Sequence, residues 1–144
     1  MGKAAPAIHR VHKLLMAARK ELARRNVRTT VYDPDRFGEP AWDILLHLYV
    51  AAYEERMFIL TKEAVVAANV PYTTALRWLN HLEQAGEIEK AHPSDDGRVT
   101  YVGLSGKGII RVEQALSALI DAEVKVEARS FEKRFSRAAD RLRE

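Results

Sequence analysis

The sequence predicts a mainly α-helical chain that carries one small β-hairpin, and three observations lead to this fold class. Apolar residues recur at three- and four-residue steps through long stretches, as they do in amphipathic helices. Apolar and polar residues alternate in two short stretches within 87–104, as they do in paired antiparallel strands. With 144 residues, 47% of them hydrophobic, the chain is long enough for one compact core with helical extensions, and two full domains would be cramped.

Composition excludes several classes of protein. No run of about 18 apolar residues is present, and Lys3, Arg10 and Lys13 interrupt the apolar residues at the N-terminus, so neither a membrane span nor a signal peptide is visible. We therefore expect a soluble, cytoplasmic protein with no membrane partner. The absence of cysteine excludes disulfides, thiolate metal sites and redox chemistry at sulfur.

The first predicted element is a basic helix from Pro6 to about Asn26, within an N-terminal segment, 1–28, that we expect to dimerise. Alternating three- and four-residue steps place one apolar stripe on it, formed by Ile8, Val11, Leu15, Ala18 and Leu22. Its other faces carry six cations, Arg10, Lys13, Arg19, Lys20, Arg24 and Arg25. The stripe packs either on the chain's own domain or on a partner.

A loop with turn residues, Val27 to Glu39, precedes the predicted central helix. Pro40 suits the first turn of this helix, which runs to about Tyr53 and is apolar on most faces, so we expect it to be buried. Thr61 is then expected to cap a short helix over 62–68, after a link that contains Phe58 and Ile59.

A three-residue turn separates that short helix from a second one over 72–85. Asn69 suits a left-handed C-terminal position, and Pro71 forbids continuation of the helix. The second helix ends at Gly86. Two short helices joined in this way predict a helix-turn-helix whose second helix is presented outward.

A hairpin of strands within 87–92 and 98–104, with its turn at 93–97, follows as a wing. Residues 40–104 therefore predict a winged helix-turn-helix.

Ser105 is expected to cap a last helix that occupies 105–144. Its first apolar stripe contains Ile109, Val112, Leu116 and Leu119, and a second, in a shifted frame, contains Val124, Ala128, Phe131, Phe135, Ala138 and Leu142. The two terminal helices exceed what so small a core can cover, which favours a homodimer over packing on the chain's own domain.

The helix over 72–85 separates on a helical wheel into an apolar side and a polar side. Ala75, Leu79 and Leu82 point one way. The opposite face, which carries no acid, and its margins hold the candidate DNA-binding residues Tyr72, Thr73, Thr74, Arg77, Asn80, His81 and Gln84. Hydroxyl, amide, imidazole and guanidinium groups hydrogen-bond phosphates and base edges in a major groove. The alternative is a merely solvated face.

Charge along the chain opposes this interpretation in part. Residues 1–30 hold eight Lys and Arg against one Glu, whereas residues 31–104 hold six against twelve Asp and Glu. If double-stranded DNA is the partner, the central region must bind it through local placement of cations, because its net charge repels a polyanion. Arg98, next to the wing turn, is a candidate for an adjacent minor groove, or else a solvated turn residue.

The sequence resembles the MarR-type winged-helix transcriptional regulators. The resemblance lies in the order of elements and in the stretch Asp96-Gly97-Arg98-Val99-Thr100-Tyr101-Val102-Gly103-Leu104-Ser105-Gly106-Lys107-Gly108. Residues 79–88 similarly resemble the end of that family's recognition helix. The resemblance covers about residues 40 to 120 and implies a symmetric dimer whose recognition helices enter successive major grooves about one helical turn apart. Arg98 matches the wing-tip arginine, but Val99 stands where a second basic residue is usual.

Histidine and aromatic residues are further candidate site residues. His9 and His12 are a surface pair rather than metal ligands, because no third ligand lies nearby in sequence. His47 is either a hydrogen-bonded core residue or a ligand. Trp42, Tyr49 and Tyr53 either form core or line a pocket for a small aromatic effector, which the resemblance permits. No nucleophile stands with a base, so we expect no enzyme, no cofactor and no catalytic residue.

The sequence thus predicts a homodimeric, DNA-binding transcriptional regulator with its recognition helix at 72–85 and its wing at 93–98. The alternative is a winged-helix module that binds other proteins without reading bases, which the acidic balance of 31–104 supports.

Overall fold

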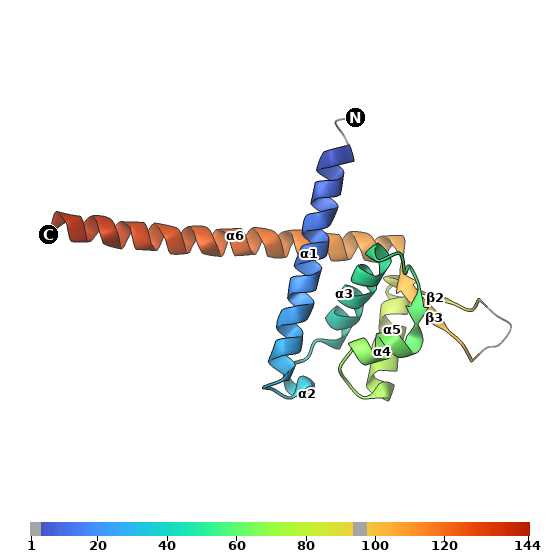
Figure 1. Cartoon of the computed structure of the whole chain (residues 1–144). Coiled ribbons are helices and arrows are strands. Elements are labelled where there is room, and N and C mark those ends of the chain that lie inside the picture. Colours follow the sequence, from blue (N-terminus) through green and yellow to red (C-terminus); the bar gives the residue numbers. More distant parts are fainter. Residues whose placement is uncertain (1–3, 94–97) are drawn as a thin grey trace.

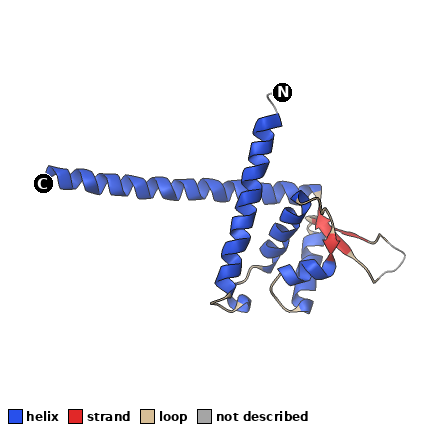
Figure 2. Ribbon diagram, viewed as in Figure 1, coloured by secondary structure: helices blue, strands red, loops and turns tan. Residues whose placement is uncertain are grey.

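The computed structural model describes residues 4–93 and 98–144, and its mainly helical fold with a small sheet confirms the predicted fold class (Figure 2). The helices are α1 (Ala4–Thr29), α2 (Pro34–Phe37), α3 (Pro40–Tyr53), α4 (Thr61–Ala67), α5 (Tyr72–Gln84) and α6 (Gly106–Arg143). The strands are β1 (Ile59–Leu60), β2 (Ile88–Ala91) and β3 (Tyr101–Leu104).

The helices α1 and α6 cross each other, and the other elements lie to one side of this crossing (Figure 1). The first turns of α6 lie against the compact body made of α3, α4, α5 and the strands, while its remainder extends away as a single rod. The N-terminal part of α1 projects past α6, away from α4 and α5. Two helical ends therefore extend from one compact body.

α3 is the central helix of the core, as its apolar sequence predicts. Pro40 stands in its first turn, where the missing N–H has no helical partner to lose. The buried apolar residues of α3 are Ile44, Leu46, Leu48, Tyr49 and Ala51. α1 adds Leu14 and Ala18, and α6 adds Val112 and Leu116. Leu14, which is not in the predicted stripe of α1, is buried, whereas Ile8 at the end of that stripe is exposed.

The sheet has three strands where the sequence predicted two. Its order is β1-β3-β2 and both pairings are antiparallel, with Ile59 opposite Val102 and Ile88 opposite Leu104. The predicted link with Phe58 and Ile59 therefore contains a strand. Two residues cannot show a period, so only pairing with β3 makes this segment a strand.

Two further local predictions are wrong. Thr61 is the first residue of α4 rather than its cap, and its Oγ1 lies 3.1 Å from the carbonyl oxygen of Thr100 and 2.6 Å from its Oγ1. The predicted loop from Val27 to Glu39 includes the end of α1 and the single turn α2. At the end of α1 the hydroxyls of Thr29 and Thr30 donate to the carbonyl oxygens of Asn26 and Val27, so these carbonyls are satisfied without water.

α6 is one continuous helix of 38 residues. Ser105 caps it as predicted, with Oγ accepting from the Gly108 N–H at 2.9 Å. The second apolar stripe, from Val124 to Leu142, is exposed along its whole length. The alternative that this part of the helix packs on its own domain is therefore wrong.

Candidate nucleic-acid interface

The turn between α4 and α5 has the geometry that its residues predict. Asn69 has a φ of 53°, a left-handed conformation that asparagine adopts more readily than most side chains. Pro71 precedes α5, and its carbonyl oxygen accepts the N–H of Ala75 at 2.9 Å. α4, the turn and α5 form the predicted helix-turn-helix.

α5 is anchored by the three side chains that the helical wheel selected. Ala75, Leu79 and Leu82 are buried. Of the candidate residues on the other side, Thr74 is half-buried and the rest are exposed, namely Tyr72, Thr73, Arg77, Asn80, His81 and Gln84. The helix therefore presents a polar face, defined here by Thr73, Arg77, Asn80 and Gln84 and called the reading face below. No carboxylate belongs to it.

One residue of the reading face is held by the wing. Lys90 in β2 donates from Nζ to Oδ1 of Asn80 at 2.8 Å, and the same ammonium lies 3.4 Å from Oε1 of Glu83. At the edge of the face, the rings of Trp78 and His81 are 5.8 Å apart. Sequence reasoning did not find Lys90, because a side-chain contact between α5 and β2 leaves no periodic signal in the sequence.

Arg98 is exposed and lies in the wing just before β3. The predicted turn residues Ser94, Asp95, Asp96 and Gly97 lie outside the described residues. β3 pairs with β2 inside the wing and with β1 on its other edge, so the described part of the wing is joined to β1 through β3.

The end of α5 is tied to the start of α6. Gly86 has a φ of 75°, a conformation that favours glycine, and its carbonyl oxygen accepts the hydroxyl of Ser105 at 2.6 Å. Lys107 donates from Nζ to the carbonyl oxygen of Ala85 at 2.8 Å. Gly108 packs so closely that an added Cβ would lie 2.0 Å from the carbonyl oxygen of Glu87. The orientation of the reading face is therefore fixed relative to the rod of α6.

Cations from outside the central region pair with its acids. Arg19 of α1 contacts Glu54 at 3.2 Å, and Arg111 of α6 contacts Glu87 at 2.7 Å. The acids paired in this way from α1 or α6 are Glu39, Asp43, Glu54 and Glu87. A charge count along residues 31–104 therefore overstates the repulsion that a polyanion would meet, because the fold brings compensating charge from the terminal helices.

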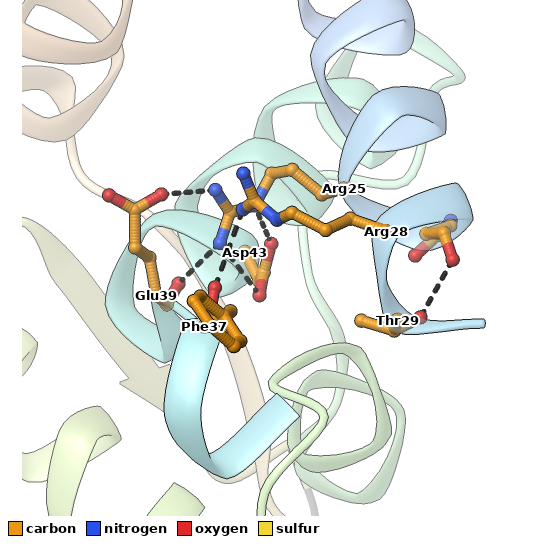
Figure 3. A network of polar contacts seen from close by, with 7 residues as sticks. Arg25, Arg28, Thr29, Phe37, Glu39 and Asp43 are labelled. Atoms are coloured by element: carbon orange, nitrogen blue, oxygen red, sulfur yellow. Dashed lines mark hydrogen bonds and ion pairs between the residues drawn. The ribbon is translucent and has the colours of Figure 1, made fainter. Parts of the chain in front are cut away.

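Arg25 makes the most buried of these contacts (Figure 3). Its guanidinium donates to both carboxylate oxygens of Asp43 and to Glu39, and Arg28 beside it donates to the carbonyl oxygen of Phe37 at 3.4 Å. Burial disfavours the charged guanidinium, but the hydrogen bonds and attraction of the two carboxylates outweigh it and raise the pKa of Arg25. This network joins α1 to the start of α3.

His47 is hydrogen-bonded, which is one of the two roles expected for it. Its Nε2 lies 3.2 Å from Oε1 of Glu63. Arg56 donates to both carboxylate oxygens of Glu63, at 3.0 and 3.1 Å. Burial alone would raise the pKa of Glu63, but the hydrogen bonds from Arg56 and His47 hold it below its ordinary value.

The three aromatic residues considered for an effector pocket are not alike. Tyr49 is fully buried, its hydroxyl donates to Oε2 of Glu113 at 3.1 Å, and burial raises its pKa. Tyr53 is partly exposed and its ring centroid lies 4.8 Å from that of Tyr49. Trp42 lines a cavity of about 180 Å³ between α3 and α6. A second cavity of about 290 Å³ lies between α1 and α6, and sequence reasoning did not anticipate it.

His9 and His12 lie on an exposed part of α1. Within residues 4–93 and 98–144, no group of three or more His, Asp or Glu side chains is placed to hold a metal ion. In the same two ranges, every helix is either too short or too polar to cross a bilayer.

Comparisons with known proteins give matches in fold. No protein-family profile and no curated sequence matches the chain. The S. aureus MepR–DNA complex is 18% identical, with a TM-score of 0.50 over 78% of this chain and 84% of that one. A S. aureus MepR mutant bound to an oligodeoxyribonucleotide is 15% identical, with a TM-score of 0.50 over 87% of this chain and 89% of that one.

A MarR family transcriptional regulator from Silicibacter pomeroyi DSS is 16% identical, with a TM-score of 0.49 over 74% of this chain and 68% of that one. At such identities the similarity is one of fold. The chain has the winged helix-turn-helix fold of the MarR-type regulators.

Proposed function

We propose that this protein is a dimeric transcriptional regulator that binds double-stranded DNA, with α5 in the major groove and wing residues 93–98 at the minor groove. The observation that carries the proposal is the reading face of α5. Its hydroxyl, guanidinium and amide groups are exposed together without a carboxylate among them, on a helix whose opposite side is buried. Such groups hydrogen-bond both phosphate oxygens and base edges.

Two further observations support DNA as the partner. Four acids of the central region are paired by arginines of α1 and α6, which removes much of the electrostatic objection. The two MepR structures compared above are both complexes with DNA. Arg77 is the strongest candidate for a base contact, because a guanidinium matches the two acceptors of guanine.

The exposed stripe of α6 supports the dimer. Val124, Phe131, Phe135 and Leu142 are between 58% and 90% exposed, although they repeat at heptad spacing on one face. A repeating apolar face of this length is typical of a helix that packs against another helix. A two-fold axis through this region would present two copies of α5 to a pseudo-palindromic site.

Fluorescence anisotropy with randomised and genomic duplexes at low salt tests the proposal. Arg77→Ala should weaken specific binding by about 1–3 kcal/mol if this side chain reads a guanine. Arg129→Ala is the matched control. It removes an exposed arginine from the side of α6 opposite the apolar stripe and leaves α5 intact. The salt dependence of binding then counts the phosphates that the protein contacts.

Equal binding by wild type and by the double variant Arg77→Ala, Arg98→Ala would show that neither arginine contributes to DNA binding. Absence of any salt-sensitive DNA binding, together with co-purification of a stoichiometric protein partner, would instead favour the winged-helix protein-interaction module.

A further inference from the structure

Asn80 is a reading-face residue whose side chain is oriented by a contact with the wing. Lys90 donates from Nζ to Oδ1 of Asn80 at 2.8 Å, and Oε1 of Glu83 lies 3.4 Å from the same ammonium. Lys90 is half-buried, and the pairing of β2 with β3 sets its position by placing it opposite Val102. The contact therefore joins the wing to the recognition helix through one amide group.

The chemistry of this contact determines which way the amide faces. A lysine ammonium only donates hydrogen bonds, so it selects the oxygen of the asparagine amide and not its nitrogen. The bond from Lys90 uses one of the two lone pairs of Oδ1 and turns this oxygen toward the wing, so the Nδ2 group of Asn80 is the end turned away from Lys90. Asn80 is exposed, so this end is available at the surface of α5.

This orientation changes the base that Asn80 is suited to read. An asparagine that recognises adenine uses both ends of its amide, donating to N7 and accepting from the N6 amino group. Guanine presents two acceptors, N7 and O6, and needs only donors. Glu83 pairs with the Lys90 ammonium and largely offsets its charge, so the preference for guanine follows from the orientation of the Asn80 amide and not from the charge of Lys90.

We propose that Lys90 is a positioning residue that makes Asn80 a hydrogen-bond donor and so selects guanine over adenine at one position of each half-site. This inference rests on the proposed binding of DNA through the reading face. Lys90 acts through Asn80 and is not required to touch the DNA. A purely structural tether would change the strength of binding for all sequences alike.

Selection of bound duplexes from a random pool tests the inference, with wild type, Asn80→Ala, Lys90→Met and Lys90→Arg compared under one salt concentration. Asn80→Ala should abolish the preference at one position and thereby identify it. Lys90→Met keeps the aliphatic stem but loses the ammonium, so the ratio of guanine to adenine at that position should fall by about tenfold. Lys90→Arg retains donors and should preserve the preference.

Lys133→Met is the matched control. It removes an exposed lysine from the side of α6 opposite the apolar stripe, away from Asn80 and from the contacts that orient α5. Its selected sequences should equal those of wild type. Circular dichroism spectra of all variants should overlay, because each substitution leaves the core residues in place.

Two kinds of failure are distinguishable. If wild type selects a motif but Lys90→Met retains the preference that Asn80→Ala loses, or if Asn80→Ala loses none, the role of Lys90 is wrong and DNA binding stands. If wild type enriches no motif and binds no duplex at low salt, the proposed function fails and this inference fails with it.

Discussion

Arg25 of α1 and Asp43 of α3 form an ion pair that is almost fully removed from solvent, with 5% and 4% of each residue exposed. Both carboxylate oxygens of Asp43 accept from this guanidinium, and Glu39 adds a third contact. The pair lies where the projecting helix α1 joins the compact body, so it holds the orientation of α1 relative to the winged helix-turn-helix.

Asp43→Asn should destabilise the protein strongly, because it leaves the guanidinium of Arg25 buried without its main counter-charge. We expect a loss of about 3 kcal/mol in the free energy of unfolding, measured by urea denaturation at one protein concentration. The double variant Arg25→Met, Asp43→Leu should recover most of the loss, since it removes both charges. A change below about 0.5 kcal/mol for Asp43→Asn would show that water reaches the pair.

Glu63 should make stability depend on pH in acid. Its folded-state pKa lies below the ordinary value of 4.5, so its contribution is present at neutral pH and is lost as pH falls through the folded pKa. Glu63→Gln should lower the free energy of unfolding at pH 7 by about 0.5 kcal/mol, a small value because the carboxylate is partly exposed. The difference between variant and wild type should shrink below pH 4.5 in a urea series. A difference that grows in acid would contradict the assignment.

The apolar stripe on α6 should control the oligomeric state. Wild type is expected to sediment as a dimer at micromolar concentration, and Phe131→Asp, Phe135→Asp together should raise the dimer dissociation constant by about 100-fold or more. These rings are 70% and 68% exposed in the single chain, so the fold of the body should survive. Arg129→Asp, on the opposite side of the helix, is the control and should remain dimeric. A monomeric wild type would contradict the assignment of the stripe as a dimer interface.

Gly108 should be far more sensitive to substitution than Gly106, two residues away in the same helix turn. An added Cβ at Gly108 meets the carbonyl oxygen of Glu87 at 2.0 Å, whereas one at Gly106 meets nothing within 4 Å. Gly108→Ala is expected to reduce the free energy of unfolding by about 1–3 kcal/mol. Gly106→Ala should be neutral or stabilising by up to about 1 kcal/mol. Thermal melts of the two variants give the comparison. Equal melting temperatures would contradict the close packing of Gly108 on the backbone of Glu87.

Features that depend on nearby residues could be predicted. The period of Ala75, Leu79 and Leu82 indicated which side of α5 is buried, and Asn69 with Pro71 indicated the turn before it. The cap at Ser105 was predictable for the same reason, because a cap involves residues within one helical turn.

Features that depend on distant residues could not be predicted. The strand β1 exists only because Ile59 and Leu60 pair with β3, about forty residues later in the chain. Thr61 bonds Thr100 instead of capping α4, since the strand pairing brings that acceptor to it. Local propensity carries no information about such a partner.

Local sequence patterns were sufficient to predict the helix-turn-helix, the wing and the polar composition of the reading face, because each follows from periods and turn residues within a few positions. The folded chain was needed to show how the acids of the central region are paired, that Lys90 orients Asn80, and that the α6 stripe stays exposed beside the described part of the body. The physical reason is that helical and strand periods are local, whereas ion pairs and side-chain orientation depend on groups that only the folded backbone brings together.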